Sequence, residues 1–365
     1  MRPPILSAPA RLNAATRIGS PLPLYLAGAY TLLAIYGSLY PLTGWHDSGA
    51  SLTAFLTADW PRYITAFDIL SNLAAYMPLG FLWAAALRRW LALPLAVALA
   101  VVIGGGLSYG METLQHFLPS RVPSNVDLGF NALGALIGAL AAARWAKSVF
   151  DGGLIDRQRH RLFLSGSFPD AGLLLIWLWL LTQVNPDTLL FGNGSLRQLL
   201  DVPTPLDYTA GSFVKIEAVI VAAHTLALAL FVTLLAQLAM MRRLPLLIIG
   251  AGLLAKSIAY IIMMSGRGGL AWATPGSLAG LAIGLLLWWL ATFLYARWQR
   301  ALAALSLLVA TVLVNIAPEN PYLANIYQIW NPGQFLNFHG LTRLASDLWP
   351  FLALPWLMLM RTYER

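Results

Sequence analysis

Residues 110–138 of the chain read GMETLQHFLPSRVPSNVDLGFNALGALIG. Acidic, basic and amide side chains gather in this stretch, although only 10% of the whole chain is charged. Ionisable groups at the edge of a bilayer are costly unless they pair or function, so we look for a site here first. The stretch ends in a helix of small residues that opens a long apolar run. It therefore indicates both a helical membrane fold and the place of its candidate site.

The composition outside this stretch fixes the class of protein. Of 365 residues, 59% are hydrophobic, and apolar runs long enough to cross a hydrocarbon core of ~30 Å recur along the chain. We predict an all-α, polytopic integral membrane protein with the lipid bilayer as its solvent. The chain has no Cys, which excludes disulfides, a thiolate nucleophile and Cys-ligated metal sites.

Hydropathy predicts about ten transmembrane helices. They lie near residues 23–42, 69–87, 91–113, 127–146, 171–186, 216–241, 244–264, 276–296, 301–317 and 342–360. An orientation with both termini in the cytoplasm places most of the Lys and Arg residues in cytoplasmic segments, which is the favoured arrangement. Most acids then fall outside or at the outer rim, so we expect the functional face to be extracytoplasmic.

We attribute the net charge of +8 to the basic residues of the cytoplasmic loops in this topology. The basic residues are scattered in short loops and form no stripe with interleaved aromatic residues, so we expect no nucleic-acid partner. Anionic lipid headgroups are the expected contact.

The chain also contains a predicted internal repeat. A shift of 146 residues aligns the small-residue helix 131–138 with residues 277–284, and it aligns Arg121 with Arg267. Such a repeat favours two four-helix units in the same orientation. The predicted organisation is a cytoplasmic tail (1–22), a first four-helix unit (23–147), a basic linker (148–169), a degenerate repeat (170–296) and a C-terminal helix pair with its tail (297–365).

The second unit is expected to lack the polar groups of the first. The same shift places Glu112, Gln115 and Asp127 on apolar residues, which are Ile258, Ile261 and Ala273. We therefore expect the first unit to carry the chemistry.

Polar residues of three predicted spans should meet at one depth near the outer face. They are Glu112, Gln115 and His116 on one face of the third span, Asp68 and Asn72 at the start of the second, and Asp127 and Asn131 at the start of the fourth. Arg121 lies in the loop directly above, where a guanidinium can hold a phosphate or carboxylate through two hydrogen bonds. The sequence thus predicts a ligand-binding cluster of acids, amides and one cation.

Each of these residues also has a purely structural interpretation. Asp127 and Asp68 would serve equally as helix caps, and Asn131 as a hydrogen bond between helices. Glu112 and Arg121 would form a structural ion pair that locks the loop.

Two further residues are secondary candidates. Lys256 lies about 18 Å into its span at 1.5 Å per residue, so it either pairs with a carboxylate, lines a cavity or snorkels. His116 is favoured as an interfacial side chain. No His-x-x-x-His or Glu-x-x-His helix and no phosphate-binding loop occurs, so we expect no metal and no cofactor.

Three ordered motifs resemble a known family. They are Asp68-x-x-x-Asn72-x-x-x-Tyr76-x-Pro78, then Ser108-x-x-x-Glu112-x-x-Gln115-x-Phe117-x-Pro-x-Arg121, then Asp127-x-x-x-Asn131-x-x-Gly134-x-x-x-Gly138. Together they look like the VanZ-like family, and the resemblance covers residues 25–146. It implies a bacterial protein of the cytoplasmic (inner) membrane that acts at the cell envelope, with teicoplanin resistance as the role of the named member. It also implies that Glu112, Gln115, Arg121, Asp127, Asn131, Asp68 and Asn72 are the site residues.

Three functions are compatible with this pattern. The first is binding or repositioning of a lipid-linked or cell-wall component, or of an anionic lipid, at the outer leaflet. The second is an enzyme that acts on a lipid-linked phosphate with Glu112 as acid or base. The third is a transporter, suggested by the repeat and by Lys256. We favour the first.

Overall fold

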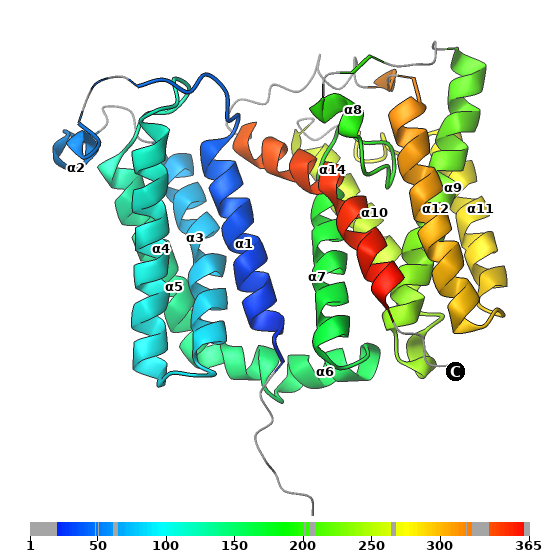
Figure 1. Ribbon diagram of the computed structural model, residues 1–365, viewed down its shortest axis with the longest axis horizontal. Helices are drawn as coiled ribbons and strands as arrows, with labels where there is room; N and C mark the ends of the chain where they lie inside the picture. The colour runs from blue at the N-terminus through cyan, green and yellow to red at the C-terminus, as the bar shows by residue number, and fades with distance from the viewer. Residues whose placement is uncertain are drawn as a thin grey trace, which may run out of the picture.

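The computed structural model describes residues 20–47, 49, 51–60, 65–200, 202–203, 209–263, 268–318, 320–322 and 336–360. Within these ranges the regular elements are helical, and one isolated bridge joins Phe163 to Ala236. The main helices, shown in Figure 1, are α1 (Leu22–Leu39), α3 (Ala66–Leu87), α4 (Leu93–Gln115), α5 (Asn125–Phe150), α7 (Ser167–Thr182), α9 (Ala210–Leu235), α10 (Leu244–Met263), α11 (Pro275–Ala291), α12 (Ala296–Ile316) and α14 (Leu336–Leu359). Shorter helices are α2 (Ala54–Thr57), α6 (Leu154–Leu162), α8 (Leu196–Leu199) and the 3-10 helix η1 (Leu238–Met240).

Seven helices in the described part of the chain are long and apolar enough to cross a membrane, which confirms a helical membrane protein. They are α1, α3, α4, α5, α9, α10 and α12. The apolar helices α7 and α11 are shorter, with 16 and 17 residues. Helix α14 overlaps the last predicted span but contains Arg343, Asp347 and two prolines. A helix thus overlaps each predicted span, while the full count of ten transmembrane helices stays a prediction.

Helices pack closely in the first half of the molecule, which comprises α1 to α5. Gly134 of α5 lies against the backbone of α3, where a Cβ atom would come within 2.5 Å of the Leu73 carbonyl oxygen. One turn further, a Cβ atom on Gly138 would overlap the carbonyl oxygen of Met77. Small residues permit this approach of two backbones, which is the usual basis of tight helix pairing in membranes.

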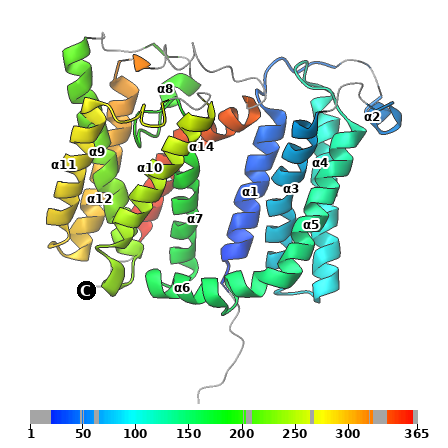
Figure 2. The same ribbon diagram turned by 180° about the vertical axis from the view of Figure 1, so that it is seen from behind.

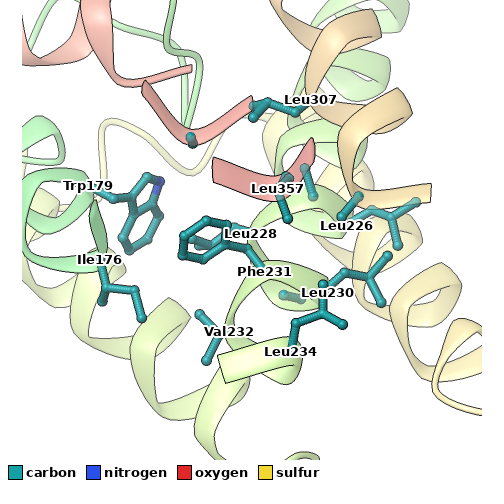
Figure 3. Close-up of a cluster of buried hydrophobic side chains, with 14 of the residues drawn as sticks. Ile176, Trp179, Leu226, Leu228, Leu230, Phe231, Val232, Leu234, Leu307 and Leu357 are labelled. Atoms are coloured by element: carbon teal, nitrogen blue, oxygen red, sulfur yellow. The ribbon is translucent and has the colours of Figure 1, made fainter. Parts of the chain in front are cut away.

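In the second half, which comprises α7 to α14, the same close contact of backbones occurs between α9 and α11. Gly280 and Gly284 of α11 face the carbonyl oxygens of Ala218 and Ala222 of α9. From Ile220 on, helix α9 is enclosed by its neighbours, and the hydrophobic side chains of its C-terminal half form a large core cluster together with α7, α12 and α14 (Figure 3). Ile176, Trp179, Phe231 and Leu357 are among the residues at the centre of this cluster.

The two halves are joined firmly at one end of the helices. Helix α6 runs across this end, between α5 and α7 (Figure 2). Arg159 of α6 forms ion pairs with Asp156 and with the buried Asp170 at the start of α7. Ser20, just before α1, also donates a hydrogen bond of 2.5 Å to Asp170. In the predicted topology this is the cytoplasmic end.

The opposite end carries the longer connections, with the single turns α2 and α8. The α2 connection packs on the first half, because His46 N donates to the carbonyl oxygen of Phe117 at 3.0 Å and Asn125 Nδ2 donates to that of Ala58 at 2.7 Å. The prediction for Arg267 in the repeat lies outside the described residues.

Candidate functional site

A cavity of about 940 Å³ lies between the two halves, near the end that is opposite α6. One wall comes from α1, α3, α4, α5 and the α4–α5 loop, and the other from α7, α10 and α14. The seven primary site residues predicted from the sequence line this cavity, whereas the secondary candidate His116 does not. They are Asp68, Asn72, Glu112, Gln115, Arg121, Asp127 and Asn131. The structure therefore brings together side chains that are up to 63 positions apart in the sequence (131 − 68).

Glu112 and Arg121 both fasten the loop above the cavity. The Glu112 carboxylate, only 3% exposed, accepts a hydrogen bond of 2.8 Å from the backbone N–H of Ser124. Arg121 Nη2 donates to the carbonyl oxygen of Tyr40 at 2.6 Å. Burial lowers the pKa of the Arg121 guanidinium, and the nearby Glu112 carboxylate opposes this shift. Arg121 remains a cation at neutral pH, so a guanidinium and a carboxyl group line the same space.

The starts of α3 and α5 are linked by the Asn72 and Asp127 side chains. Asn72 Nδ2 donates to Asp127 Oδ1 at 2.8 Å. The cap of α5 is Ser124, whose hydroxyl accepts from the backbone N–H of Asp127. The Asp127 carboxylate is thus turned toward α3 rather than toward its own helix end, and the cap interpretation of Asp127 is wrong.

Asp68 is a helix cap, which is the structural role considered for it as the alternative. Its carboxylate accepts hydrogen bonds from the backbone N–H and the hydroxyl of Thr65 at 3.0 and 2.7 Å, which completes a capping box at the start of α3. The side chain is exposed at the cavity rim. Its contribution to a ligand would be through charge at the entrance.

The amides of Asn131 and Gln115 hold neighbouring helices. Asn131 Nδ2 donates to Ser108 Oγ of α4 at 2.9 Å, and Gln115 Nε2 donates to the carbonyl oxygen of Ser38 of α1 at 2.9 Å. The helix-to-helix interpretation of Asn131 is therefore correct. Its Oδ1 atom is buried and has no hydrogen-bond partner among the described residues.

The two secondary candidates do not line this cavity. His116 ends α4 and packs edge-on against Phe117. Lys256 is 1% exposed and lies in the second half, where its Nζ donates to the carbonyl oxygens of Asn185 and Thr188 at 2.9 and 3.0 Å. Backbone carbonyls thus make direct contacts with this ammonium, and of the alternatives left open a carboxylate, that of Asp187, acts on it only through its charge.

The structure adds residues that the sequence did not indicate. Tyr76 lies on the cavity wall one turn beyond Asn72, and its place in the first motif is the signal that was available. Trp177 of α7 and Phe338 and Leu341 of α14 form part of the facing apolar wall. No local pattern marks them, because only the docking of the two halves places them there.

No group of three or more His, Asp or Glu side chains suited to a metal ion occurs in the described ranges. Comparison with protein families gives one finding: the model described as VanZ/LLP1 matches residues 26–146. This match confirms the resemblance that the three motifs indicate, over almost the same residues. Comparison with curated proteins and with solved structures gives no match.

Proposed function

We propose that this chain, a multi-pass membrane protein that is VanZ-like over residues 26–146, binds or repositions a lipid-linked or cell-wall component at the outer leaflet. The observation that carries the proposal is the cavity of about 940 Å³, which is lined by the seven primary site residues on one side and by apolar residues on the other. A volume of this size accepts a large headgroup with part of an acyl or prenyl chain.

The lining defines the chemistry of the ligand. Arg121 would hold an anionic group such as a phosphate, because a guanidinium donates two parallel hydrogen bonds. Glu112 and Asp127 supply carboxyl oxygens to the cavity and would orient hydroxyl or amide groups. Trp177 and its apolar neighbours would contact the hydrocarbon part. A polar, anionic headgroup on a lipid chain matches both walls.

The finer topology belongs to the same proposal. We place the chain in the bacterial cytoplasmic (inner) membrane with ten spans, both termini inside and the cavity near the extracytoplasmic face. The glycine contacts support the internal repeat, since Gly134 and Gly280 are 146 residues apart (280 − 134) and their carbonyl partners Leu73 and Ala218 are 145 apart (218 − 73).

Direct ligand binding is the test. The purified chain in detergent would be incubated with a lipid-linked cell-wall precursor and with phosphatidylglycerol, and native mass spectrometry would count the retained molecules. Arg121→Ala and Glu112→Gln should each weaken retention roughly tenfold or more, because each removes a charge-assisted hydrogen bond. Asp59→Asn, an exposed acid outside the cavity, is the matched control. Equal retention by wild type and both cavity variants would refute the proposal.

A link to glycopeptide resistance is the further part of the proposal. Teicoplanin and vancomycin susceptibility would be compared in a sensitive host without an outer membrane, at matched abundance of wild type, Glu112→Gln and Arg121→Ala. We expect selective protection against teicoplanin by wild type alone. No protection by wild type would remove the resistance role and leave the binding proposal to the retention experiment.

A further inference from the structure

Helix α1 closes one side of the large cavity. It packs against α3 of the first half and against α7 and α14 of the second half. These contacts are close, because the Tyr30 hydroxyl donates to the carbonyl oxygen of Ala75 at 2.8 Å and a Cβ atom on Gly340 of α14 would lie 2.6 Å from the Tyr40 ring. A ligand therefore cannot pass between α1 and these neighbours unless the helices separate.

Helices α3 and α10 border the other side of the cavity. In the described part of the chain, α3 packs on helices of the first half and has no extensive packing with α7, α10 or α14. Helix α10 is fixed to its own half, since the Tyr260 hydroxyl donates to the carbonyl oxygen of Pro186 at 3.0 Å. Helix α14 lies in front of α10 in Figure 1 and behind it in Figure 2, so these two helices border the cavity from opposite faces of the molecule. The side between α3 and α10 is thus left open.

Small and apolar side chains border this opening. Phe67 and Ala74 of α3 line the cavity on one side, and Ala259 and Ile262 of α10 line it on the other. Ala74 is exposed and Ile262 is 59% exposed, so neither side chain is covered by the opposite helix. The opening is therefore suited to a hydrocarbon chain.

The lipid-facing surface of each helix continues into the cavity. Leu70 of α3 and Ile258 of α10 are exposed but do not line the cavity. Leu70 is four residues before Ala74, and Ile258 is four residues before Ile262, so each pair lies on one helix face. An apolar path thus leads from the outer surface of both helices to the cavity.

The polar and apolar parts of the lining are arranged as in a lipid of the outer leaflet. Arg121 and Asp127 belong to the loop and helix start at the outer end in the predicted topology. Tyr30, halfway along α1, lies further inward, and its ring centre is 6.5 Å from that of Trp177. A headgroup held at the outer end would leave its chain beside α3 and α10.

We propose that the ligand of the large cavity is a lipid-anchored molecule that enters sideways from the outer leaflet, between α3 and α10. The inference rests on the proposed binding function and names the class of its ligand. The anionic headgroup lies at Arg121, and the hydrocarbon chain passes between Ala74 and Ile262. This route keeps the chain in an apolar environment, whereas entry from water would expose it.

Lipid exchange tests the entrance. The detergent-purified chain with bound phosphatidylglycerol would be mixed with excess deuterated phosphatidylglycerol, and native mass spectrometry would follow the replacement of one by the other. Ala74→Trp places a ring in the opening and should slow the exchange at least about tenfold. Ile262→Trp narrows the opening from the opposite helix and should slow the exchange as well.

Two control variants carry the same ring outside the cavity. Leu70→Trp and Ile258→Trp change the neighbouring exposed positions of α3 and α10, and both should exchange lipid at the wild-type rate. All four substituted positions are exposed, so we expect each variant to fold.

A probe without acyl chains tests the class of ligand. Glycerophosphoglycerol carries the phosphate and headgroup of phosphatidylglycerol alone. A roughly hundredfold excess should not displace the bound lipid, because this probe makes no contact with the apolar wall. Displacement by an equimolar amount would show that the site takes a water-soluble molecule and would overturn the inference.

The outcomes separate this inference from the binding function on which it rests. No retained lipid in wild type would overturn both. Lipid retention that is weakened by Arg121→Ala, together with equal exchange rates in Ala74→Trp, Ile262→Trp and the two controls, would overturn the entrance alone.

Discussion

Replacing Gly134 with alanine tests whether backbone contact between α3 and α5 holds the first half together. The new Cβ atom would lie 2.5 Å from the Leu73 carbonyl oxygen and 3.2 Å from its carbon. An ordinary carbon–oxygen contact is about 3.3 Å, so the two helices must separate by roughly 0.8 Å. Because the obstacle is backbone, no side chain can rotate to relieve it. We expect a destabilisation of about 1–3 kcal/mol, the usual cost of an overpacked core.

Gly129 of the same helix provides the matched control. It is exposed, and a Cβ atom there would meet nothing within 4 Å. Both substitutions gain about 1 kcal/mol or less of helix propensity, so the difference between the two variants isolates the clash. Thermal unfolding of the detergent-purified proteins measures that difference. Size-exclusion chromatography checks that each variant is monodisperse. The Cβ atom of Gly284→Ala would lie 2.7 Å from the Ala222 carbonyl oxygen, so this variant should also unfold at a lower temperature than Gly129→Ala. Equal unfolding temperatures for Gly134→Ala and Gly129→Ala would refute the packing argument.

Two other stability predictions concern buried charges. Arg159→Ala should destabilise the chain by about 3–5 kcal/mol, because it leaves the buried Asp170 carboxylate without its ion-pair partner at the junction of the two halves, and Asp170→Asn in the same background should recover part of the loss. Lys256→Met should cost about 1–3 kcal/mol by removing the donor to the Asn185 and Thr188 carbonyl oxygens. Thermal unfolding measures both, and a Lys256→Met variant as stable as wild type would contradict the stabilising role given to these hydrogen bonds.

The helices and the first polar cluster were predictable because they rest on local signals. Apolar length placed a helix at each predicted span, and helical spacing placed Glu112 and Gln115 on one face. The roles of the two aspartates, Asp68 and Asp127, were harder to predict from the sequence. Asp68 caps its own helix while Asp127 bonds across to Asn72, although both follow the same local pattern. Only the position of a partner on another helix separates the two cases.

Features that form where the two halves of the molecule meet could not be predicted from local sequence patterns. The apolar wall of the large cavity comes from residues of α7, α10 and α14, and the first of them, Trp177, lies 39 residues after the motifs end at Gly138 (177 − 138). A smaller pocket of about 150 Å³ in the second half likewise joins α9 and α10 with the connecting segments 188–190, 271–274 and 320–322. Neither has a spacing pattern, since each is assembled by tertiary contacts.

The placement of the acids in the two halves follows one physical rule. In each half a small-residue helix, α5 or α11, lies against its partner through glycines, and its N-terminus carries backbone N–H groups and the positive end of the helix dipole. A buried carboxylate is favoured beside such an end. Glu112 reaches the α5 cap Ser124 from α4, and Glu217 reaches the α11 cap Thr274 from α9. In both halves an acid thus lies at a helix start, although a shift of 146 residues places Glu112 on the apolar Ile258.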